Sequence, residues 1–337
     1  MSTSLKPTLA RLAQGETLSA PEAEAAFGII MDGQATPAQI GGMLMAMRTR
    51  GETVPELSGA VTALRKRMAR VEAPKGAIDV CGTGGDGAAS LNISTAVTFV
   101  LTACGVPVAK HGNKALSSRS GGADVLTSLG IGIEPPADRL ASILQQVGCV
   151  FLFAPRHHPA LRHAASVRVE LGTRTIFNLT GPLANPASVT RQLMGVYDKK
   201  WLLPAAETLR DLGSEAVWVV HGGGMDELVL EGENDVTALQ NGIIRSFTLK
   251  ASDAGLSASP AAALQGGDAA YNAAALLALL RGEPGAYRDT VLFNAAAALV
   301  MAEHVQTLSE GVARAAQVID DGAALVVLER LKAACEV

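Results

Sequence analysis

The 337-residue sequence has few aromatic residues, few cysteines and little net charge. Aromatics make up 4%, and the four cysteines lack Cys-x-x-Cys spacing, so a zinc site is not supported and buried thiols in a reducing cytoplasm are expected. A net charge of -4 gives no broad basic field, so nucleic acid is not expected as a partner. No apolar run could span a bilayer and no signal pattern opens the chain, which predicts a soluble cytoplasmic protein without a membrane partner.

The apolar pattern changes along the chain from helical spacing to alternating strands and helices. Residues 1–72 carry helix-start signals at Ser19, Thr36 and Thr53, each followed three residues later by Glu or Gln. From residue 77, apolar strands alternate with helices, which predicts an α/β fold whose mostly parallel central sheet is covered on both faces. We therefore expect a small N-terminal helical domain, 1–72, and a larger α/β domain, 77–337.

The expected elements place several polar loops at strand ends. Strands are expected at 77–81, 106–109, 149–153, 192–196 and 216–221, with a hairpin over 235–249 that turns at Asn241-Gly242. Helices are expected near 93–104, 121–129, 136–147, 158–171, 201–212, 268–281, 285–304 and 309–334. Ligands of parallel sheets bind beyond the carboxyl ends of the strands, so the loops at those ends are the candidate binding segments.

The first candidate is a glycine-rich loop, 82–87, between a predicted strand and a predicted helix. Its glycines allow the backbone to approach a ligand closely, and the helix start offers unpaired N–H groups, which together predict a phosphate site. A Walker loop is excluded because no Gly-Lys-Ser/Thr ending occurs. The dinucleotide fingerprint is a weak match, since the next strand ends in Lys110-His111 and not in an acidic residue. Ser90, Asn92, Ser94 and Thr95 add polar side chains, two of which could instead cap the helix.

Two further segments are expected at the same edge of the sheet. The loop 110–122 contains three cations, which suit a polyphosphate, and Asp226-Glu227 follows three glycines and could bind magnesium together with substrate phosphates. Each could alone be a solvated surface loop, and His111 could be a structural hydrogen-bonding group. Their shared position favours binding. On the predicted helix 158–171, one of the arginines, Arg162 or Arg168, could hold a substrate carboxylate through two hydrogen bonds.

Six motifs together resemble the anthranilate phosphoribosyltransferase family over nearly the whole chain. They are Cys-Gly-Thr-Gly-Gly-Asp-Gly at 81–87, Asn-Ile-Ser-Thr at 92–95, Lys-His-Gly-Asn at 110–113 with Ser117-Ser118, Glu-Leu-Gly-Thr-Arg-Thr-Ile-Phe-Asn at 170–178, Gly-Pro-Leu-Ala-Asn-Pro at 181–186 and His-Gly-Gly-Gly-Met-Asp-Glu at 221–227. The resemblance implies Mg²⁺-dependent transfer of the 5-phosphoribosyl group of phosphoribosyl pyrophosphate (PRPP) to the amine of anthranilate, releasing pyrophosphate, in tryptophan biosynthesis. It also implies a nucleoside phosphorylase/phosphoribosyltransferase type of fold, and a homodimer through the helical domain, which part of 160–190 would join.

The resemblance assigns roles to individual residues. PRPP would be bound by Gly82, Gly85, Asp86, Ser90, Asn92, Ser94, Thr95, Lys110, Asn113, Lys114, Ser117, Ser118 and Gly122. Anthranilate would be contacted by Gly82, His111, Asn113, Arg168 and Pro182, and two magnesium ions would be bound by Ser94, Asp226 and Glu227. No acid or base catalyst is assigned, because a neutral aniline nitrogen is already nucleophilic and the protein gains most by stabilising the departing pyrophosphate and positioning the nucleophile.

Three positions depart from the family pattern, and two other functions stay open. Gly122 stands where Ser or Ala is frequent, Lys114 where Arg is frequent and Gly223 where an acidic residue is common, which we expect to affect affinity more than activity. A pyrimidine nucleoside phosphorylase would not be expected to combine Asn-Ile-Ser-Thr with the Asp226-Glu227 pair. A non-catalytic nucleic-acid-binding relative would be expected to lose parts of these motifs and to gain basic surface.

Overall fold

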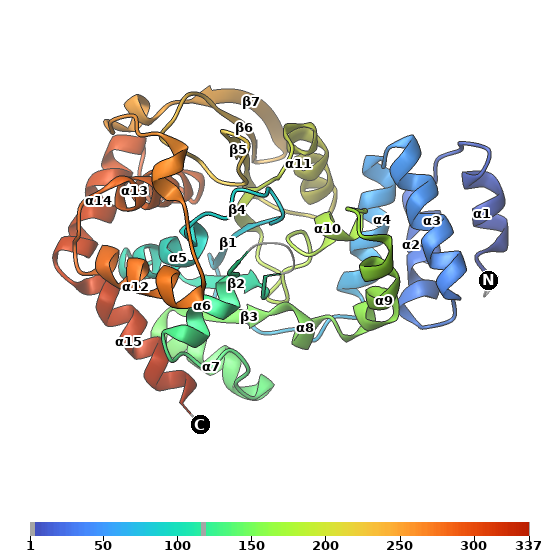
Figure 1. Ribbon diagram of the computed structural model, residues 1–337, viewed down its shortest axis with the longest axis horizontal. Helices are drawn as coiled ribbons and strands as arrows, with labels where there is room; N and C mark the ends of the chain where they lie inside the picture. Colours follow the sequence, from blue (N-terminus) through green and yellow to red (C-terminus); the bar gives the residue numbers. More distant parts are fainter. Residues whose placement is uncertain (1–3, 116–118, 337) are drawn as a thin grey trace.

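The computed structural model describes residues 4–115 and 119–336 and shows a helical lobe beside a larger α/β lobe (Figure 1). The predicted site residues Ser117 and Ser118 lie outside the described residues. The helical lobe contains α1 (Lys6–Leu12), α2 (Ala20–Met31), α3 (Pro37–Arg50) and α4 (Val54–Arg65). Three of these helices start where the sequence predicts, because the backbone N–H of Ser19, Thr36 or Thr53 donates to the Glu or Gln side chain three residues later.

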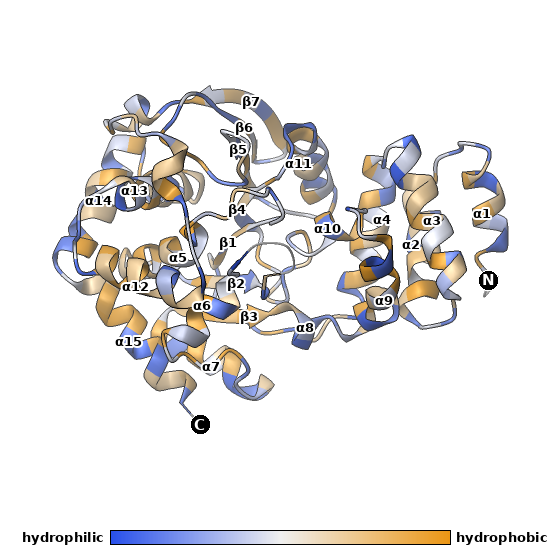
Figure 2. Cartoon of the chain, in the orientation of Figure 1, coloured by the Kyte–Doolittle hydropathy of each residue, from blue (hydrophilic) through white to orange (hydrophobic). Residues whose placement is uncertain are grey.

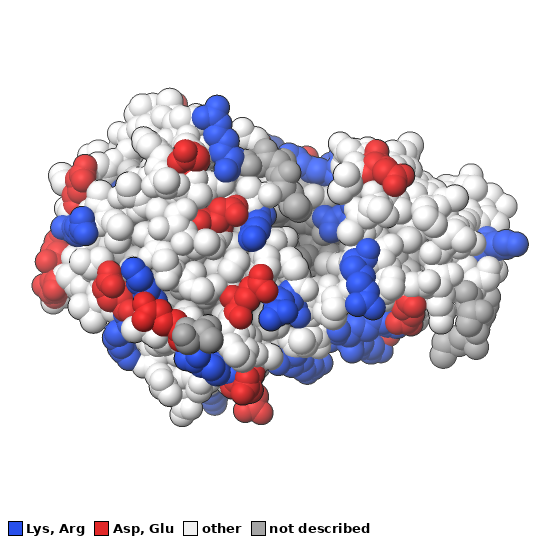
Figure 3. Space-filling view, turned by 60° about the horizontal axis from the view of Figure 1, so that its bottom comes forward, with Lys and Arg blue, Asp and Glu red and all other residues white. Residues whose placement is uncertain are grey.

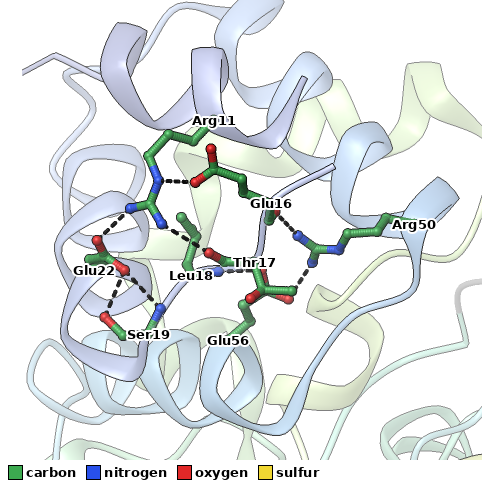
Figure 4. Close-up of polar contacts among 8 residues, drawn as sticks. All are labelled: Arg11, Glu16, Thr17, Leu18, Ser19, Glu22, Arg50 and Glu56. Carbon is green, nitrogen blue, oxygen red and sulfur yellow. Dashed lines mark hydrogen bonds and ion pairs between the residues drawn. The ribbon is translucent and has the colours of Figure 1, made fainter. Parts of the chain in front are cut away.

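A buried carboxylate ties the loops of the helical lobe together (Figure 4). Glu56 is fully buried and accepts hydrogen bonds from the backbone of Leu18 and Thr53 and from the guanidinium of Arg50. The same guanidinium donates to the carbonyl of Glu16. The segment between α1 and α2 is therefore fastened to the start of α4 by charge-assisted hydrogen bonds.

The larger lobe is built on a seven-stranded sheet of order β3-β2-β1-β4-β5-β6-β7. Its strands are β1 (Ile78–Gly82), β2 (Val108–Gly112), β3 (Cys149–Phe153), β4 (Arg191–Gly195), β5 (Ala216–Gly222), β6 (Asn234–Gln240) and β7 (Ile243–Leu249). The first five strands are parallel, and β6 and β7 form an antiparallel hairpin. The mostly parallel sheet and the hairpin turning at Asn241-Gly242 are both confirmed.

Helices cover both faces of the sheet, which separates two apolar cores. They are α5 (Ile93–Ala103), α6 (Gly122–Ser128), α7 (Ala137–Val147), α8 (Ala154–His157), α9 (Arg162–Leu171), α10 (Phe177–Thr180), α11 (Leu202–Asp211), α12 (Ala269–Leu280), α13 (Ala286–Met301), α14 (Leu308–Asp320) and α15 (Ala323–Cys335). One core contains residues of α5, α12 and α13. Figure 2 shows α5 and α12 mostly in orange shades, which mark hydrophobic residues. The other core includes Val217 and Val219 of β5, continues through α11, and reaches α2, α3 and α4. The helical lobe therefore shares a continuous core with one face of the sheet.

The sequence-based boundaries are wrong at several places. The short helices α8 and α10 were not expected, and the expected helix 158–171 is a 3-10 helix, Pro159–Leu161, followed by α9. The expected helix 309–334 is two helices, because Gly322 adopts a left-handed φ of 74° between α14 and α15. Strand β2 extends through Lys110, His111 and Gly112, which the sequence assigns to a loop. Lys110 is compatible with a buried strand because the carbonyl of Val80 and the hydroxyl of Ser94 accept hydrogen bonds from its ammonium group.

All four cysteine thiols are buried and free, as expected. None of the described helices combines the length and the apolar character that crossing a lipid bilayer requires.

Candidate active site

The site lies where the winding of the sheet reverses. Strands β1 and β4 are neighbours in the sheet although β2 and β3 come between them in the chain. The loops that leave β1 and β4 therefore run toward opposite halves of the sheet and open a crevice, which is where ligands of such sheets bind. The glycine-rich loop that begins at Gly82 leaves β1 at this point.

A cavity of about 310 Å³ occupies this edge of the sheet. Gly85, Lys110 and Asp226, which come from the three predicted loops, all lie around it. Figure 3 shows the surface hollowed between the two lobes, with Lys and Arg side chains near the rim. The predicted site residues that line the cavity are Gly82, Gly85, Asp86, Ser90, Asn92, Ser94, Thr95, Lys110, His111, Asn113, Lys114, Gly122, Arg168, Pro182, Asp226 and Glu227. Their ligands remain predictions.

Two glycines make room for the segment that carries Asp226. A Cβ at Gly82 would lie 2.2 Å from Asp226 Oδ2, and a Cβ at Gly195 would lie 1.5 Å from the carbonyl oxygen of Asp226. Asp226 Oδ2 in turn accepts a 2.7 Å hydrogen bond from the N–H of Gly84. Glycine at the ends of β1 and β4 therefore lets the acidic segment pack directly on the sheet and reach the glycine-rich loop.

Three carboxyl groups meet beside the start of α5. The N–H of Asp226 lies 3.5 Å from Asp86 Oδ2, and Glu227 Oε1 accepts a 3.2 Å hydrogen bond from the N–H of Ser94. Asn92 occupies the N-cap position without a side-chain cap, so Glu227 serves the helix start instead. Burial, followed by repulsion from Asp86, raises the pKa of Asp226 to about 7, and burial with repulsion from Asp226 raises the pKa of Glu227 to about 8.

Lys110 lies within this acidic end of the cavity. Its side chain is buried, and its ammonium group donates to the carbonyl of Val80 at 2.7 Å and to Ser94 Oγ at 3.1 Å. Its positive charge lowers the pKa of Glu227 against the larger effect of burial. Lys110 is therefore a buried lysine that hydrogen bonds hold in place at the cavity. It is not the exposed residue that a solvated loop would carry.

The donor set at this end suits magnesium. Within 4–115 and 119–336, no group of three or more His, Cys, Asp or Glu side chains is arranged to hold a metal ion without help. Asp226 and Glu227 nevertheless place two half-buried carboxyl groups beside the start of α5, where Glu227 accepts a hydrogen bond from the N–H of Ser94. Mg²⁺ prefers such oxygen ligands and completes its shell with water and substrate phosphates, so the residues present fit this ion.

The side of the cavity toward the helical lobe carries Arg168 of α9, whose side chain is half-buried. Burial lowers the pKa of Arg168, and its guanidinium lies 5.6 Å from the centroid of the Phe177 ring. Among the described residues, no carboxylate forms an ion pair with Arg168. A half-buried guanidinium without a carboxylate of its own is suited to an anionic ligand that binds through two hydrogen bonds.

Two uncharged histidines also line the cavity. The imidazoles of His111 and His158 pack edge to face with centroids 5.0 Å apart. Burial is the main cause that lowers the pKa of His111 well below its usual value and that of His158 to about 4. Both rings are therefore neutral near pH 7 and form an uncharged wall. His157 is instead a structural group, because its Nδ1 lies 2.8 Å from the carbonyl of Ala69.

Sequence reasoning did not assign several cavity residues. His158, Phe177 and Asn178 line the cavity. Phe177 and Asn178 belong to the motif at 170–178 and His158 follows a predicted strand, but none of the three was given a role. No spacing in the sequence distinguishes them, since they reach the cavity only through the packing of α8, α9 and α10 against the sheet. A histidine pair that precedes Pro159 is a signal for attention, but it does not tell which ring faces a ligand.

Both lobes match known protein families. A glycosyl transferase family helical bundle domain matches residues 6–68, and a glycosyl transferase family a/b domain matches residues 74–325. An anthranilate phosphoribosyltransferase of Mesorhizobium japonicum is 58% identical over 97% of this chain and 97% of its own length, and one of Brucella suis is 56% identical over 97% and 96%.

Solved structures agree with the sequence relatives. The anthranilate phosphoribosyltransferase of Thermus thermophilus superposes with a TM-score of 0.93 at 41% identity, covering 98% of this chain and 99% of that one. That of Saccharomyces cerevisiae, in complex with PRPP and Mg, superposes with a TM-score of 0.89 at 26% identity over 99% of both chains. The fold, the shared motifs and the identity over the full length agree, and the chain belongs to the anthranilate phosphoribosyltransferase family.

Proposed function

We propose that this chain transfers the 5-phosphoribosyl group of PRPP to the amine of anthranilate, giving N-(5-phosphoribosyl)anthranilate and pyrophosphate, as a step of tryptophan biosynthesis. The observation that carries the proposal is the polarity of the cavity. It combines a glycine-rich loop, a buried lysine and an acidic pair with a half-buried arginine that lies beside the Phe177 ring on the side of the helical lobe. This arrangement suits a polyphosphate together with an aromatic carboxylate.

At the phosphate end, backbone and side-chain donors would bind PRPP. The proposed set includes Ser117 and Ser118. Its other members all line the cavity and are Gly82, Gly85, Asp86, Ser90, Asn92, Ser94, Thr95, Lys110, Asn113, Lys114 and Gly122. The backbone around Gly85 can approach phosphate oxygens closely, and fixed donors there cost little reorganisation when charge builds on the leaving pyrophosphate. Lys114 would contact phosphate as a point charge, without the two-pronged geometry of arginine.

Magnesium would be bound by Ser94, Asp226 and Glu227 together with PRPP oxygens, and we propose two ions. When bound, Mg²⁺ supplies positive charge that stabilises the pyrophosphate leaving group. The protein holds both carboxylates in place through the hydrogen bonds from Gly84 and Ser94. Because burial and mutual repulsion raise the pKa values of both groups, a divalent cation would relieve a cost that the fold already bears.

Anthranilate would enter between the lobes and be oriented by its carboxylate. Arg168 would bind the carboxylate through two hydrogen bonds, while Asn113, His111, Gly82 and Pro182 would line its path. The aniline nitrogen needs no strong base, so orientation of the amine toward the sugar supplies most of what the protein contributes, on the order of 7–11 kcal/mol for well-positioned reactants.

A direct assay tests the proposal. The protein is mixed with Mg²⁺, PRPP and anthranilate, and the loss of anthranilate fluorescence is followed. Fluorescence should fall only when all components are present, and pyrophosphate should appear in equal amount. Unchanged fluorescence with phosphate-dependent cleavage of thymidine would point to a nucleoside phosphorylase, and tight salt-sensitive DNA binding would point to a nucleic-acid-binding relative.

Domain borders, assembly and location complete the proposal. We propose a helical domain of 1–72 joined by part of 160–190, and an α/β domain of 77–337. The packing of α9 against α2 and α3 supports the joined segment. We also propose a cytoplasmic homodimer through the helical domain, which the family resemblance supports. Light scattering after gel filtration should give twice the monomer mass of 34.6 kDa.

A further inference from the structure

The acidic pair sits in a segment that has no regular secondary structure. After β5 ends at Gly222, residues 226–229 belong to no helix or strand of the structure. Leu228 and Val229 are nevertheless fully buried in the core of the α/β lobe. Their peptide groups are therefore shielded from water without a helix or strand of their own to satisfy them, and each unmade hydrogen bond there would be costly.

Two buried asparagine side chains satisfy these peptide groups in both directions. Asn294 of α13 accepts from the N–H of Leu228 at 3.1 Å and donates to its carbonyl at 2.8 Å. Asn234, the first residue of β6, accepts from the N–H of Val229 at 2.7 Å and donates to its carbonyl at 2.9 Å. Both asparagines have no exposed surface. Each amide thus pairs with both the N–H and the carbonyl of one residue, as a neighbouring antiparallel strand would.

The two asparagines are also anchored to separate elements. Asn294 donates to the carbonyl of Thr290 in α13 at 2.9 Å, and Asn234 donates to the carbonyl of Leu249 in β7 at 3.2 Å. A Cβ at Gly222 would lie 1.9 Å from Asn234 Oδ1, so this amide also needs glycine at the end of β5. The segment is therefore held on one side by α13 and β6 and on the other by the glycine ends of β1 and β4.

We propose that Asn294 and Asn234 are positioning residues for the magnesium site, which keep the Asp226 and Glu227 carboxylates side by side before any cation arrives. This inference rests on the proposed assignment of those carboxylates to magnesium. When both groups are ionised, as cation binding requires, the two carboxylates repel each other, and a segment without regular secondary structure could relieve the repulsion by rotating one of them away. The amide pairing at Leu228 and Val229, immediately after Glu227, opposes that rotation and preorganises the pair.

The test is binding of Mn²⁺, a spectroscopic substitute for Mg²⁺, in the presence of PRPP, measured from the loss of the free-ion electron paramagnetic resonance signal. Asn294→Ala should weaken Mn²⁺ binding by about tenfold or more, as expected when a group that orients a metal ligand is removed, and Asn234→Ala should change it in the same direction. Asn185→Ala is the matched control. Asn185 is also buried and hydrogen-bonded to backbone, at Ala109 and Ala187, but away from the acidic segment, so its variant should bind Mn²⁺ like the parent.

Three outcomes separate the possibilities. If folded Asn294→Ala binds Mn²⁺ within about twofold of the parent, the positioning role is overturned. If Asn294→Ala does not fold, Asn294→Ser and Asn234→Ala are read by the same criterion. The double variant Asp226→Asn, Glu227→Gln tests the metal assignment itself. Unchanged Mn²⁺ binding in that variant would overturn the assignment, and weakened binding there with normal binding in the asparagine variants would overturn only the inference.

Discussion

Replacing His158 should change how the stability of the protein depends on pH. This imidazole is buried against His111, and burial lowers its pKa from 6.5 to about 4. Between these two values the unfolded chain takes up a proton at His158 that the folded chain refuses. The unfolded state therefore binds more protons, and His158 makes the free energy of unfolding fall as pH falls from 6.5 to 4.

The size of this effect follows from the shift. A difference of about 2.5 between 6.5 and about 4, at 1.36 kcal/mol for each pKa unit, corresponds to roughly 3 kcal/mol when the pH has reached the folded value. At pH 5 the loss is about 2 kcal/mol. His158→Gln removes the titrating ring but keeps a polar side chain of similar size. It should cost about 1 kcal/mol at pH 7.5, and the difference from the parent should vanish or reverse at pH 5.

Urea unfolding at pH 7.5, 6 and 5, followed by tryptophan fluorescence, measures the difference. Comparison of parent and variant at each pH is needed because Asp226 and Glu227 act in the opposite direction. Their pKa values are raised to about 7 and 8, so the folded state holds their protons and gains stability as pH falls through those values. Both groups are present in both proteins and cancel in the comparison. A stability difference that stays constant from pH 7.5 to 5 would refute a neutral buried His158.

Three further substitutions test other parts of the structure. Arg168→Ala should raise the KM for anthranilate about 10- to 100-fold, from the loss of a charged hydrogen-bond donor, and leave the KM for PRPP nearly unchanged in steady-state kinetics; a selective rise for PRPP would contradict its assignment. Glu56→Ala should lower the free energy of unfolding by about 3–5 kcal/mol, because Arg50 loses its buried partner, and a loss below about 1 kcal/mol in urea titration would show that the pair is not structurally important. Gly195→Ala should weaken Mn²⁺ binding, since the added Cβ would displace Asp226. Gly181→Ala, whose Cβ meets no atom within 4 Å, should not weaken it. Equal binding by both variants would rule out the close packing of Asp226 on Gly195.

Much of this architecture could be predicted from local sequence. Capping boxes at Ser19, Thr36 and Thr53 and the apolar runs of the strands depend on residues close together in the chain, so spacing reveals them. The break between α14 and α15 was missed because Gly322 can be accommodated in a helical pattern, and only the packing of α15 against α5 and α7 decides its conformation.

The loops of the site could be predicted from the sequence, but the residues that hold those loops in place could not. Glycine-rich and charged segments after strands are visible in sequence, and the sheet rule brings them to one edge. Asn294 gave no such signal, because it lies in an apolar helix and its partner Leu228 is 66 residues away. Asn234 is only 5 residues from its partner Val229, but nothing in the sequence indicates that its side chain turns back to that residue. The burial of Lys110 was missed for a similar reason, since its partner Val80 lies on a different strand. Contacts between distant segments depend on the assembled fold.

The walls of the cavity differ around Asp226 and around Arg168, and this difference decides which positions should be varied to change the specificity for the acceptor amine. Around Asp226 the walls are main chain, and Gly82 and Gly195 leave no room for a single added carbon. Around Arg168 the walls include side chains, among them Phe177, whose ring centroid lies 5.6 Å from the guanidinium. A mutagenesis library for amines other than anthranilate should therefore vary the side chains around Arg168 and keep Gly82 and Gly195 unchanged. Substitution of either glycine would displace Asp226, and we expect such variants to bind the phosphoribosyl donor poorly.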